Sequence, residues 1–402
     1  MSLDLDRIAP QVEEMTEHID AEDASRQKHL AKAMSVLCDN SFNLDDLKNK
    51  IESGKISWMP AEPVESLSNK YTTEKPPANF TILATDGSQI DIDRHHSTRY
   101  YLINIGSIYL EYGESADARL ESTPQLYFDK KDLVMTSPDG SNREVAIEGT
   151  LLGIKRDIEE FKYLTRMAVS LKADIPALLL ADGTLIRWTL MSKDIPEFIV
   201  SEFLEKGFLK CLDEIKEISE KKSIALASYI SYPRSSDLVG TIRIAICPYN
   251  PVNCDKCRRE NPNGAYPCNT VDGVQDKDLF LTLLESGERS ALFISRSSIQ
   301  ERYGMHRIYF YYVKIDDEIA RIEIPEWIAR NDTLLNLTHT LILDQCQRGH
   351  GYPVALSEAH EQAVVTAADR QNLQTLVEAF LSEKNIDINT SAKSFSKRTR
   401  WI

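Results

Sequence analysis

Residues 80–89, FTILATDGSQ, join an apolar stretch to an Asp-Gly pair, and the fold class follows from this stretch. Its first six residues have the β-branched and apolar character of a buried strand, which we expect to end just before Asp86. Residues 177–185, ALLLADGTL, repeat the arrangement, with a continuous apolar run that stops at Asp182. Such runs are typical of central strands that are covered on both faces.

Strands and helices alternate around these two stretches. Apolar residues recur every three or four positions over residues 145–171, which predicts a helix between the two strands. The other predicted elements are strands at 98–110, at 125–128 or 133–135, and at 223–230, 291–295, 307–314 and 320–324, and helices at 8–38, 196–218, 333–347, 356–364 and 368–382. This alternation indicates an α/β protein whose sheet is flanked by helices.

We expect five segments along the chain. They are an N-terminal helical arm and linker at 1–78, the first part of a core at 79–232, a cysteine-rich insertion at 233–276, the completion of the core with C-terminal helices at 277–385, and a basic tail at 386–402. The arm is either a solvated helix that packs on the core or a dimerisation arm.

The composition is that of a globular protein. The 402 residues include 47 Lys and Arg against 62 Asp and Glu, which gives a net charge of −15. No apolar run approaches the roughly 18–20 residues of a membrane helix, and the first residues lack a secretory signal. Seven cysteines are few and odd in number, which argues against a disulfide scaffold and favours a reducing compartment. We therefore predict a cytoplasmic protein, and the lack of a long apolar run predicts no membrane contact. The acidic balance argues against indiscriminate coating of nucleic acid but not against a nuclease, because only the substrate groove has to be positive.

Asp86 and Asp182 are candidate catalytic residues. Ligands of open α/β sheets bind at the carboxyl ends of the strands, where we expect both side chains to lie. Two carboxylates at one edge repel each other unless a cation such as Mg²⁺ or Mn²⁺ lies between them. Two such ions about 3.5–4 Å apart can hydrolyse a phosphodiester. The alternative is that each Asp-Gly pair is an ordinary turn.

A third carboxylate is expected from the helix at 145–171. Helical geometry places Glu160 at the flank of the apolar stripe, Asp157 inside the stripe and Glu159 on the far face. Glu160 is therefore the preferred ligand and Asp157 its rival. The alternative is that these side chains form a solvated helix face.

Motifs in three parts of the chain resemble those of the NurA nucleases. The first is ATDGSQ at 84–89, and the second is LLADGTL at 179–185. The third is GYPVAL at 351–356, followed by EAHEQA at 358–363 and ADR at 368–370. The order of these motifs is more specific than any one of them, and the resemblance covers about residues 80–373 without the cysteine-rich segment.

The resemblance implies an RNase H-like core with a mixed sheet and a nuclease that depends on Mn²⁺ or Mg²⁺, with two ions. It implies 5′ to 3′ exonuclease and single-strand endonuclease activity on DNA, and a dimer. It also implies partnership with a hexameric HerA-type ATPase in the end resection of double-strand breaks. By position, the carboxylate metal ligands are Asp86, Glu160 and Asp182.

The resemblance also assigns roles to C-terminal residues. His360 is a metal ligand or a proton donor to the leaving group, and Tyr352 touches the substrate. Histidine exchanges protons near neutral pH, although a lone His on a helix is also compatible with a surface role. Many members have a lysine after the strand that corresponds to 223–230. Here the sequence reads SYPR at 231–234, so Arg234 is the expected phosphate contact. Arg370 can pair with a phosphate or with a nearby carboxylate.

Four of the seven cysteines lie within 22 residues. Cys247, Cys254, Cys257 and Cys268 follow the pattern C-x6-C-x2-C-x10-C, and the C-x2-C pair has the spacing with which two thiolates grip one metal. Structural Zn²⁺ is the first interpretation, an iron–sulfur cluster the second, and free thiols or disulfides the third.

The C-terminal end is basic. Lys393, Lys397, Arg398 and Arg400 alternate with Phe395 and Trp401, a mixture that binds phosphates and stacks bases. The tail is a candidate DNA-binding segment, a docking segment for the ATPase, or a solubilising end.

Two other functions fit the same residues. One is a two-metal phosphoesterase that acts on small substrates, and the other is a catalytically inactive, zinc-stapled DNA-binding scaffold. The sequence lacks the P-loop pattern of ATPases, so an ATPase has to be a separate partner.

Overall fold

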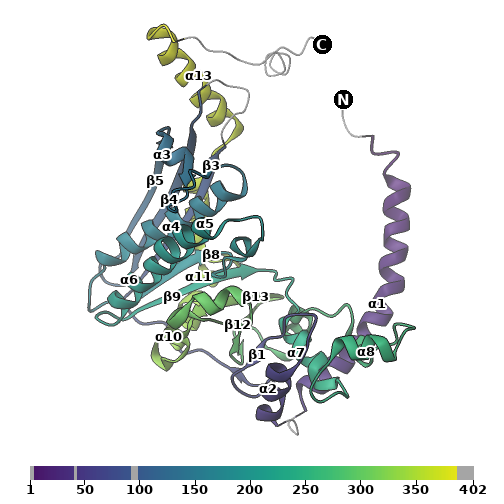
Figure 1. Ribbon diagram of the computed structural model, residues 1–402. Helices are drawn as coiled ribbons and strands as arrows, with labels where there is room; N and C mark the ends of the chain where they lie inside the picture. The colour runs from purple at the N-terminus through teal and green to yellow at the C-terminus, as the bar shows by residue number, and fades with distance from the viewer. Residues whose placement is uncertain (1–3, 40–42, 92–97, 387–402) are drawn as a thin grey trace. The chain divides into compact units, whose positions relative to one another are not determined.

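The computed structural model describes residues 4–39, 43–91 and 98–386, and the chain divides into two compact units (Figure 1). Unit 1 consists of Met1–Glu74, Ile230–Gln300 and Arg307–Ala329, and unit 2 of Lys75–Tyr229, Glu301–His306 and Arg330–Ile402. The five segments expected from the sequence stay predictions.

The sheet of unit 2 has the strand order β5-β4-β3-β8-β9. These strands are β3 (Phe80–Ile90), β4 (Tyr101–Tyr112), β5 (Asp117–Tyr127), β8 (Ala177–Asp182) and β9 (Ile224–Ser231). The first three form an antiparallel meander, β8 runs parallel to β3, and β9 runs parallel to β8. This is the strand order of an RNase H-like core, so the predicted fold class of a mixed α/β sheet is confirmed.

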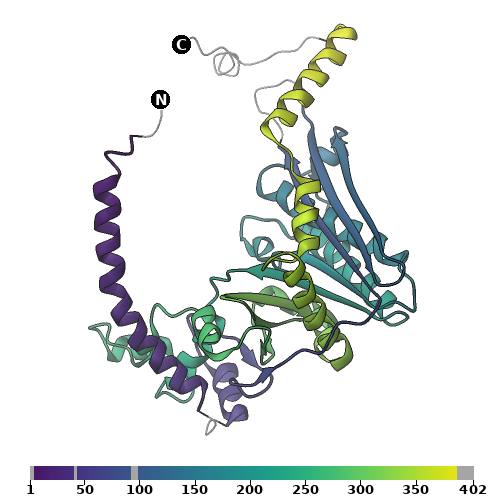
Figure 2. The ribbon, with the colours of Figure 1, turned by 180° about the vertical axis from the view of Figure 1, so that it is seen from behind.

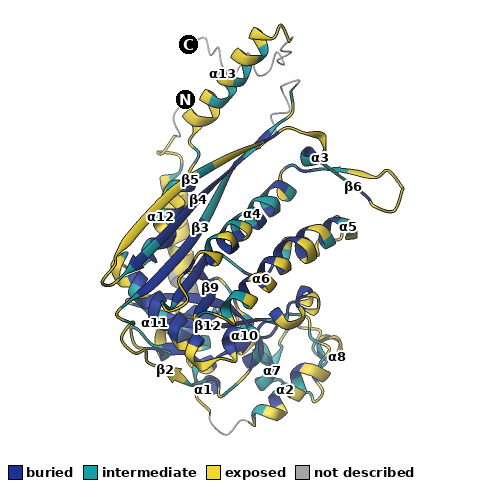
Figure 3. Ribbon diagram, turned by 90° about the vertical axis from the view of Figure 1, so that its left-hand side faces the viewer, coloured by how far each residue is buried: buried dark blue, intermediate teal, exposed yellow. Residues whose placement is uncertain are grey.

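Helices cover both faces of this sheet. α4 (Thr150–Val169) lies on one face, in contact with β3 and β4, and buries Ile158, Phe161 and Leu164. α12 (Val354–Ala363) lies on the other face, as the yellow-green C-terminal helices in Figure 2 show. Because both faces are covered, β3, β4 and β8 are largely buried, whereas β5 at the edge is exposed along nearly its whole length (Figure 3).

The remaining elements of unit 2 surround this core. They are α3 (Lys130–Leu133), β6 (Val134–Thr136), β7 (Glu144–Ala146), η1 (Trp188–Met191), α5 (Glu197–Val200), the π-helix η2 (Ser201–Leu209), α6 (Lys210–Ser219), η5 (Gly304–His306), α11 (Asp332–Arg348) and α13 (Ala367–Glu383).

Several predicted boundaries in unit 2 were wrong. The helix expected from residue 145 begins at Thr150, because Glu144–Ala146 pairs with β6 in a hairpin. The third strand of the sheet is β5, which is much longer than the predicted 125–128, and the alternative at 133–135 overlaps β6 of the hairpin. The helix expected over 196–218 is three consecutive segments, and its middle is a π-helix.

Unit 1 has a smaller antiparallel sheet. Strand β12 (Ile308–Ile315) pairs with β13 (Glu318–Pro325) and with two short strands, β10 (Arg289–Ser290) and β11 (Phe293–Ile294). The other elements are α1 (Ala9–Leu37), α2 (Leu44–Ser53), β1 (Glu62–Pro63), β2 (Lys70–Tyr71), α7 (Asp237–Ile246), α8 (Cys254–Glu260), η3 (Pro267–Val271), α9 (Asp276–Leu283), η4 (Ser298–Arg302) at the boundary, and α10 (Glu326–Ala329).

The predicted cysteine-rich insertion is not confirmed as a separate element. Within residues 233–276, α7 buries Leu238, Val239, Ile242 and Ile244 in the same apolar cluster as α1, α2 and β12. This stretch therefore helps to form the core of unit 1.

None of the helices in the described part of the chain has the length and hydropathy needed to cross a bilayer.

Candidate active site

Asp86 lies inside β3 rather than after it, which corrects the prediction that the strand ends at Thr85. It pairs with Gly106 of β4, and the ladder continues to Ile90. Side chains alternate across a strand, and Asp86 points to the face that α12 covers. There its Oδ2 lies 2.8 Å from His360 Nδ1. The ladder with β4 continues through polar residues, which apolar patterning alone does not reveal.

Asp182 is the last residue of β8 and lies beside Asp86. The parallel register places Thr85 opposite Ala181, and each is followed directly by its aspartate. Since neighbouring strands lie about 4.8 Å apart, the two carboxyl groups share one edge of the sheet. Burial and the negative charge of Asp86 raise the pKa of Asp182, as expected for two close carboxylates. Tyr352 Oη donates to Asp182 Oδ1 at 3.2 Å.

The Glu160 carboxylate of α4 lies against Gly87, the residue that follows Asp86 in β3. A Cβ atom at Gly87 would lie 2.5 Å from Glu160 Oε1, so only a glycine leaves room for this carboxylate. The hydroxyl of Thr85 donates to the Glu160 backbone carbonyl at 3.2 Å and ties the helix to the strand. Burial, together with the charges of Asp157 and Asp86, raises the pKa of Glu160 to about 8.

The three carboxylates form a donor set that suits a hard divalent cation. They come from three different elements, and the charge of Asp86 disfavours the ionised forms of both Asp182 and Glu160. Mg²⁺ and Mn²⁺ are bound by carboxylate oxygens of this kind. Within the residues that the structure describes, no three His, Cys, Asp or Glu side chains are already arranged as a metal-binding group. The fit to a cation therefore rests on the chemistry of the donors.

A model of the NurA domain matches residues 80–365 of the chain. The chain belongs to the NurA family. Its fold is similar to that of the NurA nuclease from Sulfolobus solfataricus, with a TM-score of 0.51 and 13% identity, over 94% of this chain and 98% of that chain. Membership of the NurA family supports a nuclease.

Two further solved structures match less well. The protease-reverse transcriptase of prototype foamy virus gives a TM-score of 0.22 with 14% identity, over 51% of this chain and 23% of that chain. LC9-RNase H1, a type 1 RNase H with the type 2 active-site motif, gives a TM-score of 0.20 with 10% identity, over 41% of this chain and 69% of that chain. Comparison with curated protein sequences gives no match.

Two arginines flank the carboxylates of this NurA protein, and sequence reasoning missed both. Arg156 Nε lies 3.2 Å from Glu160 Oε1, and Arg156 Nη2 lies 2.8 Å from Asp157 Oδ1. Arg187 Nη1 contacts the other Asp157 oxygen at 3.1 Å, and its guanidinium lies over the ring of Phe208. The position of Arg156 four residues before Glu160 was the available signal, because such pairs meet on a helix.

The rival helix carboxylates have partners of their own. Both Asp157 oxygens face arginines, and Glu159 Oε1 lies 2.9 Å from Lys162 Nζ. Glu160 alone among the three has its carboxylate against Gly87, where the charge of Asp86 acts on it. This placement favours Glu160 as the third ligand.

The C-terminal candidates lie around the same strands. The Tyr352 ring also packs edge-on against Tyr229 of β9, with centroids 5.4 Å apart. Arg370, at the start of α13, donates to the backbone carbonyl of Gln89 at 3.0 Å, so one of its amino groups is held by β3. In the described part of the chain, Arg370 does not form the ion pair with a nearby carboxylate that was the alternative to a phosphate contact.

The remaining predicted substrate-binding residues are Arg234 and those of the basic tail. Arg234 lies in unit 1, exposed, and lines a pocket with Trp58 and Gln275. The basic tail residues Lys397, Arg398 and Arg400 lie outside the described residues.

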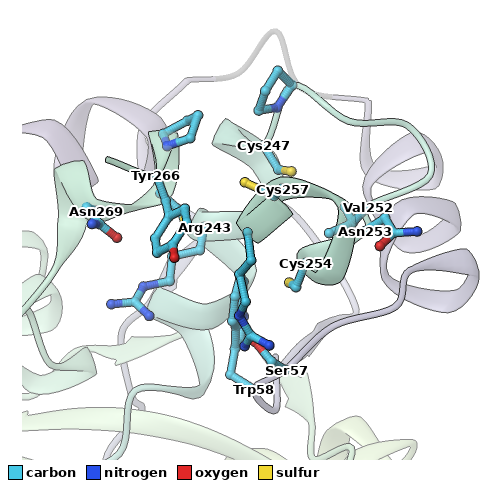
Figure 4. Close-up of a pocket in the computed structure, with 14 residues that line it drawn as sticks. Ser57, Trp58, Arg243, Cys247, Val252, Asn253, Cys254, Cys257, Tyr266 and Asn269 are labelled. Atoms are coloured by element: carbon cyan, nitrogen blue, oxygen red, sulfur yellow. The ribbon is translucent and has the colours of Figure 1, made fainter. Parts of the chain in front are cut away.

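The four clustered cysteines of unit 1 line one pocket (Figure 4). Cys247 follows α7, Cys254 and Cys257 belong to α8, and Cys268 belongs to η3. Figure 4 shows the Cys247 and Cys257 side chains directed toward each other, while Cys254 enters from the start of α8. All four are free thiols rather than disulfides, and burial raises the pKa of Cys268.

Proposed function

We propose that this protein is a metal-dependent deoxyribonuclease that hydrolyses phosphodiester bonds at Asp86, Glu160 and Asp182. The observation that supports it most is the placement of Asp86 and Asp182 side by side on β3 and β8, with the Glu160 carboxylate of α4 against Gly87. Mn²⁺ or Mg²⁺, held by these residues, would supply activation of a water and stabilisation of the leaving oxygen.

The protein's own side chains supply positioning and proton transfer. Contact with Asp86 orients the His360 ring through Nδ1, which leaves Nε2 to serve as a proton donor to the leaving group. Tyr352 orients Asp182 through its hydroxyl. The Arg156 guanidinium balances part of the negative charge beside Glu160.

The decisive experiment compares DNA cleavage by the wild-type protein with cleavage by matched variants. Asp86→Ala and Glu160→Gln should lose cleavage of end-labelled single-stranded DNA in Mn²⁺, and EDTA should abolish it in the wild type. Glu159→Gln is the control, because its carboxylate pairs with Lys162 on the same helix. It should retain activity. Cleavage by a correctly folded Asp86→Ala protein would refute the assignment.

The finer features that the family resemblance implied belong to the same proposal. They are 5′ to 3′ exonuclease and single-strand endonuclease activity, end resection of DNA breaks with a HerA-type ATPase, a homodimer, a cytoplasmic location, and substrate contacts by Tyr352, Arg370, Arg234 and the basic tail. Co-purification with such an ATPase, and its effect on digestion of blunt duplex ends, tests the partnership.

We also propose that the four cysteines hold a structural metal ion, with Zn²⁺ first and an iron–sulfur cluster second. Support comes from their common pocket and from the free state of all four thiols. Elemental analysis of the purified protein should find about one zinc per chain, and Cys257→Ser should lose it. Protein that retains wild-type stability without any metal at these thiols would contradict the proposal.

A further inference from the structure

Unit 1 contains a buried cation without an acceptor. Lys277, in the first turn of α9, is only 8% exposed. Across residues 4–39, 43–91 and 98–386, its ammonium makes no hydrogen bond or ion pair. Its partner is the ring of Tyr232, whose centroid lies 3.4 Å from Nζ. Because a buried ammonium without an acceptor is costly, this site is suited to an anion.

The ammonium faces an open groove. Its lining, which we call the Tyr232 groove, consists of Ser25, Arg26, His29, Tyr232, Asp272, Gly273, Gln275 and Lys277. Arg26 adds a second cation, held in place by Asp278 at 2.6 Å. His29 Nδ1 lies 2.8 Å from the Asp272 carbonyl.

A second pocket extends the positive surface. It shares Asp272, Gly273 and Gln275 with the groove and is also lined by Arg234 and Arg243. Arg243 is paired with Asp272 at 2.5 Å, whereas Arg234 is exposed. Arg26 and Arg243 are balanced by Asp278 and Asp272, and Asp237 also lines the second pocket. In the described part of the chain, the cations of this region that lack a carboxylate partner are therefore Lys277 and Arg234.

Tyr232 presents an aromatic ring at this surface. It is 58% exposed and has a φ of 45°, a left-handed conformation that non-glycine residues rarely adopt. Such strain is retained where the surrounding structure over-determines a conformation, often at binding sites. One face of the ring meets the Lys277 ammonium, and an exposed ring of this kind can stack on a base.

We infer that the Tyr232 groove binds single-stranded nucleic acid, with phosphates on Lys277, Arg26 and Arg234 and a base stacked on Tyr232. The inference rests on the proposed nuclease function and adds a substrate contact outside the carboxylate site. A single strand is favoured over a duplex because its bases are free to stack on a side chain.

Binding can be measured without cleavage in the full-length Asp86→Asn protein with EDTA. Fluorescence anisotropy of a labelled oligothymidylate should show about tenfold weaker binding for Lys277→Met and for Tyr232→Leu, and near-normal binding for Tyr232→Phe. The slope of log K against log salt should fall by about 0.7 for Lys277→Met, one phosphate contact on a single strand. Lys28→Met is the matched control, because Lys28 is exposed on α1 and does not line the groove.

Unchanged affinity and salt slope for both Lys277→Met and Tyr232→Leu would overturn the inference. If Lys277→Met fails to fold, Lys277→Arg keeps the charge and should bind normally, and Tyr232→Leu then decides.

Hydrolysis of bis(p-nitrophenyl) phosphate separates this inference from the proposed function. It should depend on Asp86 but not on the groove residues, and its persistence in Asp86→Ala would count against the catalytic site rather than against the groove.

Discussion

Gly87 decides how closely the Glu160 side chain of α4 can approach β3. The Glu160 carboxylate occupies the space in which a side chain at Gly87 would lie. The Asp-Gly pair therefore has a different use from the turn that its sequence suggests, because it sits inside a continuous strand. Substitution at Gly87 acts on a neighbouring carboxylate rather than on the backbone.

Gly87→Ala should lower nuclease activity by about 100-fold, because a displacement of about 1 Å in a positioned group has that effect. The measurement is kcat on single-stranded DNA, with circular dichroism to confirm folding. Gly153→Ala is the matched control on α4, since a Cβ there meets no atom within 4 Å. It should keep its activity.

The pKa of Glu160 predicts a pH dependence of stability in the metal-free protein. Its pKa is raised from 4.5 to about 8, so the folded state binds the proton more tightly than the unfolded state. The stabilisation is complete below pH 4.5 and is lost as pH rises to about 8. In EDTA, Tm should fall across this window, and Glu160→Gln should flatten the profile. Adding Mn²⁺ near pH 8 should raise Tm in the wild type alone.

At the scale of residues, sequence reasoning selects candidates that carry a local signal. Asp86 and Asp182 stood out because each interrupts an apolar run, and Glu160 because of its place beside the apolar stripe. Arg187 and Lys277 could not be found this way. Their partners, Asp157 and Tyr232, are 30 and 45 positions away in the sequence, and only the folded chain brings them together.

At the scale of elements, α7 depends on a cap from another helix. The Asp276 carboxylate, at the start of α9, accepts the backbone N–H groups of Leu238 and Val239 at 3.2 and 2.9 Å and the hydroxyl of Tyr312 at 2.7 Å. Asp276 is fully buried. The first turn of α7, which lacks a side-chain cap from its own Ser236, is satisfied by this residue.

Asp276→Ala should lower the free energy of unfolding by about 2–3 kcal/mol, because the buried N–H and O–H donors lose their acceptor. Urea titration followed by tryptophan fluorescence measures the change. Asp255→Ala on α8 removes an exposed ion pair with Arg258 and should cost less than about 1 kcal/mol. Equal losses of unfolding free energy in the two variants would show that the Asp276 cap does not stabilise the protein.

The sequence predicted whether an element is a helix or a strand more reliably than it predicted where the element begins and ends. The helix now called α1 was predicted almost to the residue, because its apolar residues keep helical spacing. The length of β3 was underestimated, because its second half is held by pairing with β4 instead of by burial. The π-helix η2 was missed, since its residues keep an apolar pattern compatible with an ordinary helix.

At the scale of the whole molecule, α13 exposes apolar side chains that suit self-association. In the described part of the chain it has no buried residue, and Leu376 and Phe380 are 54% and 59% exposed on one side. If the proposed homodimer uses this face, Leu376→Glu with Phe380→Glu should convert it to a monomer in sedimentation analysis. Glu378→Lys, on the same helix, changes charge without touching this pair. An intact dimer in the double variant would exclude α13 as the interface.

Strand β5 has a different consequence for the whole molecule. It ends the strand order of the unit 2 sheet, and its outer row of amides and carbonyls is a template on which another extended chain can pair. Asp117, Arg119, Glu121 and Pro124 lie along it, and charges and proline are the residues that discourage such pairing. Replacing them with threonine or valine would therefore be expected to make the protein prone to fibrous aggregation without altering its chemistry.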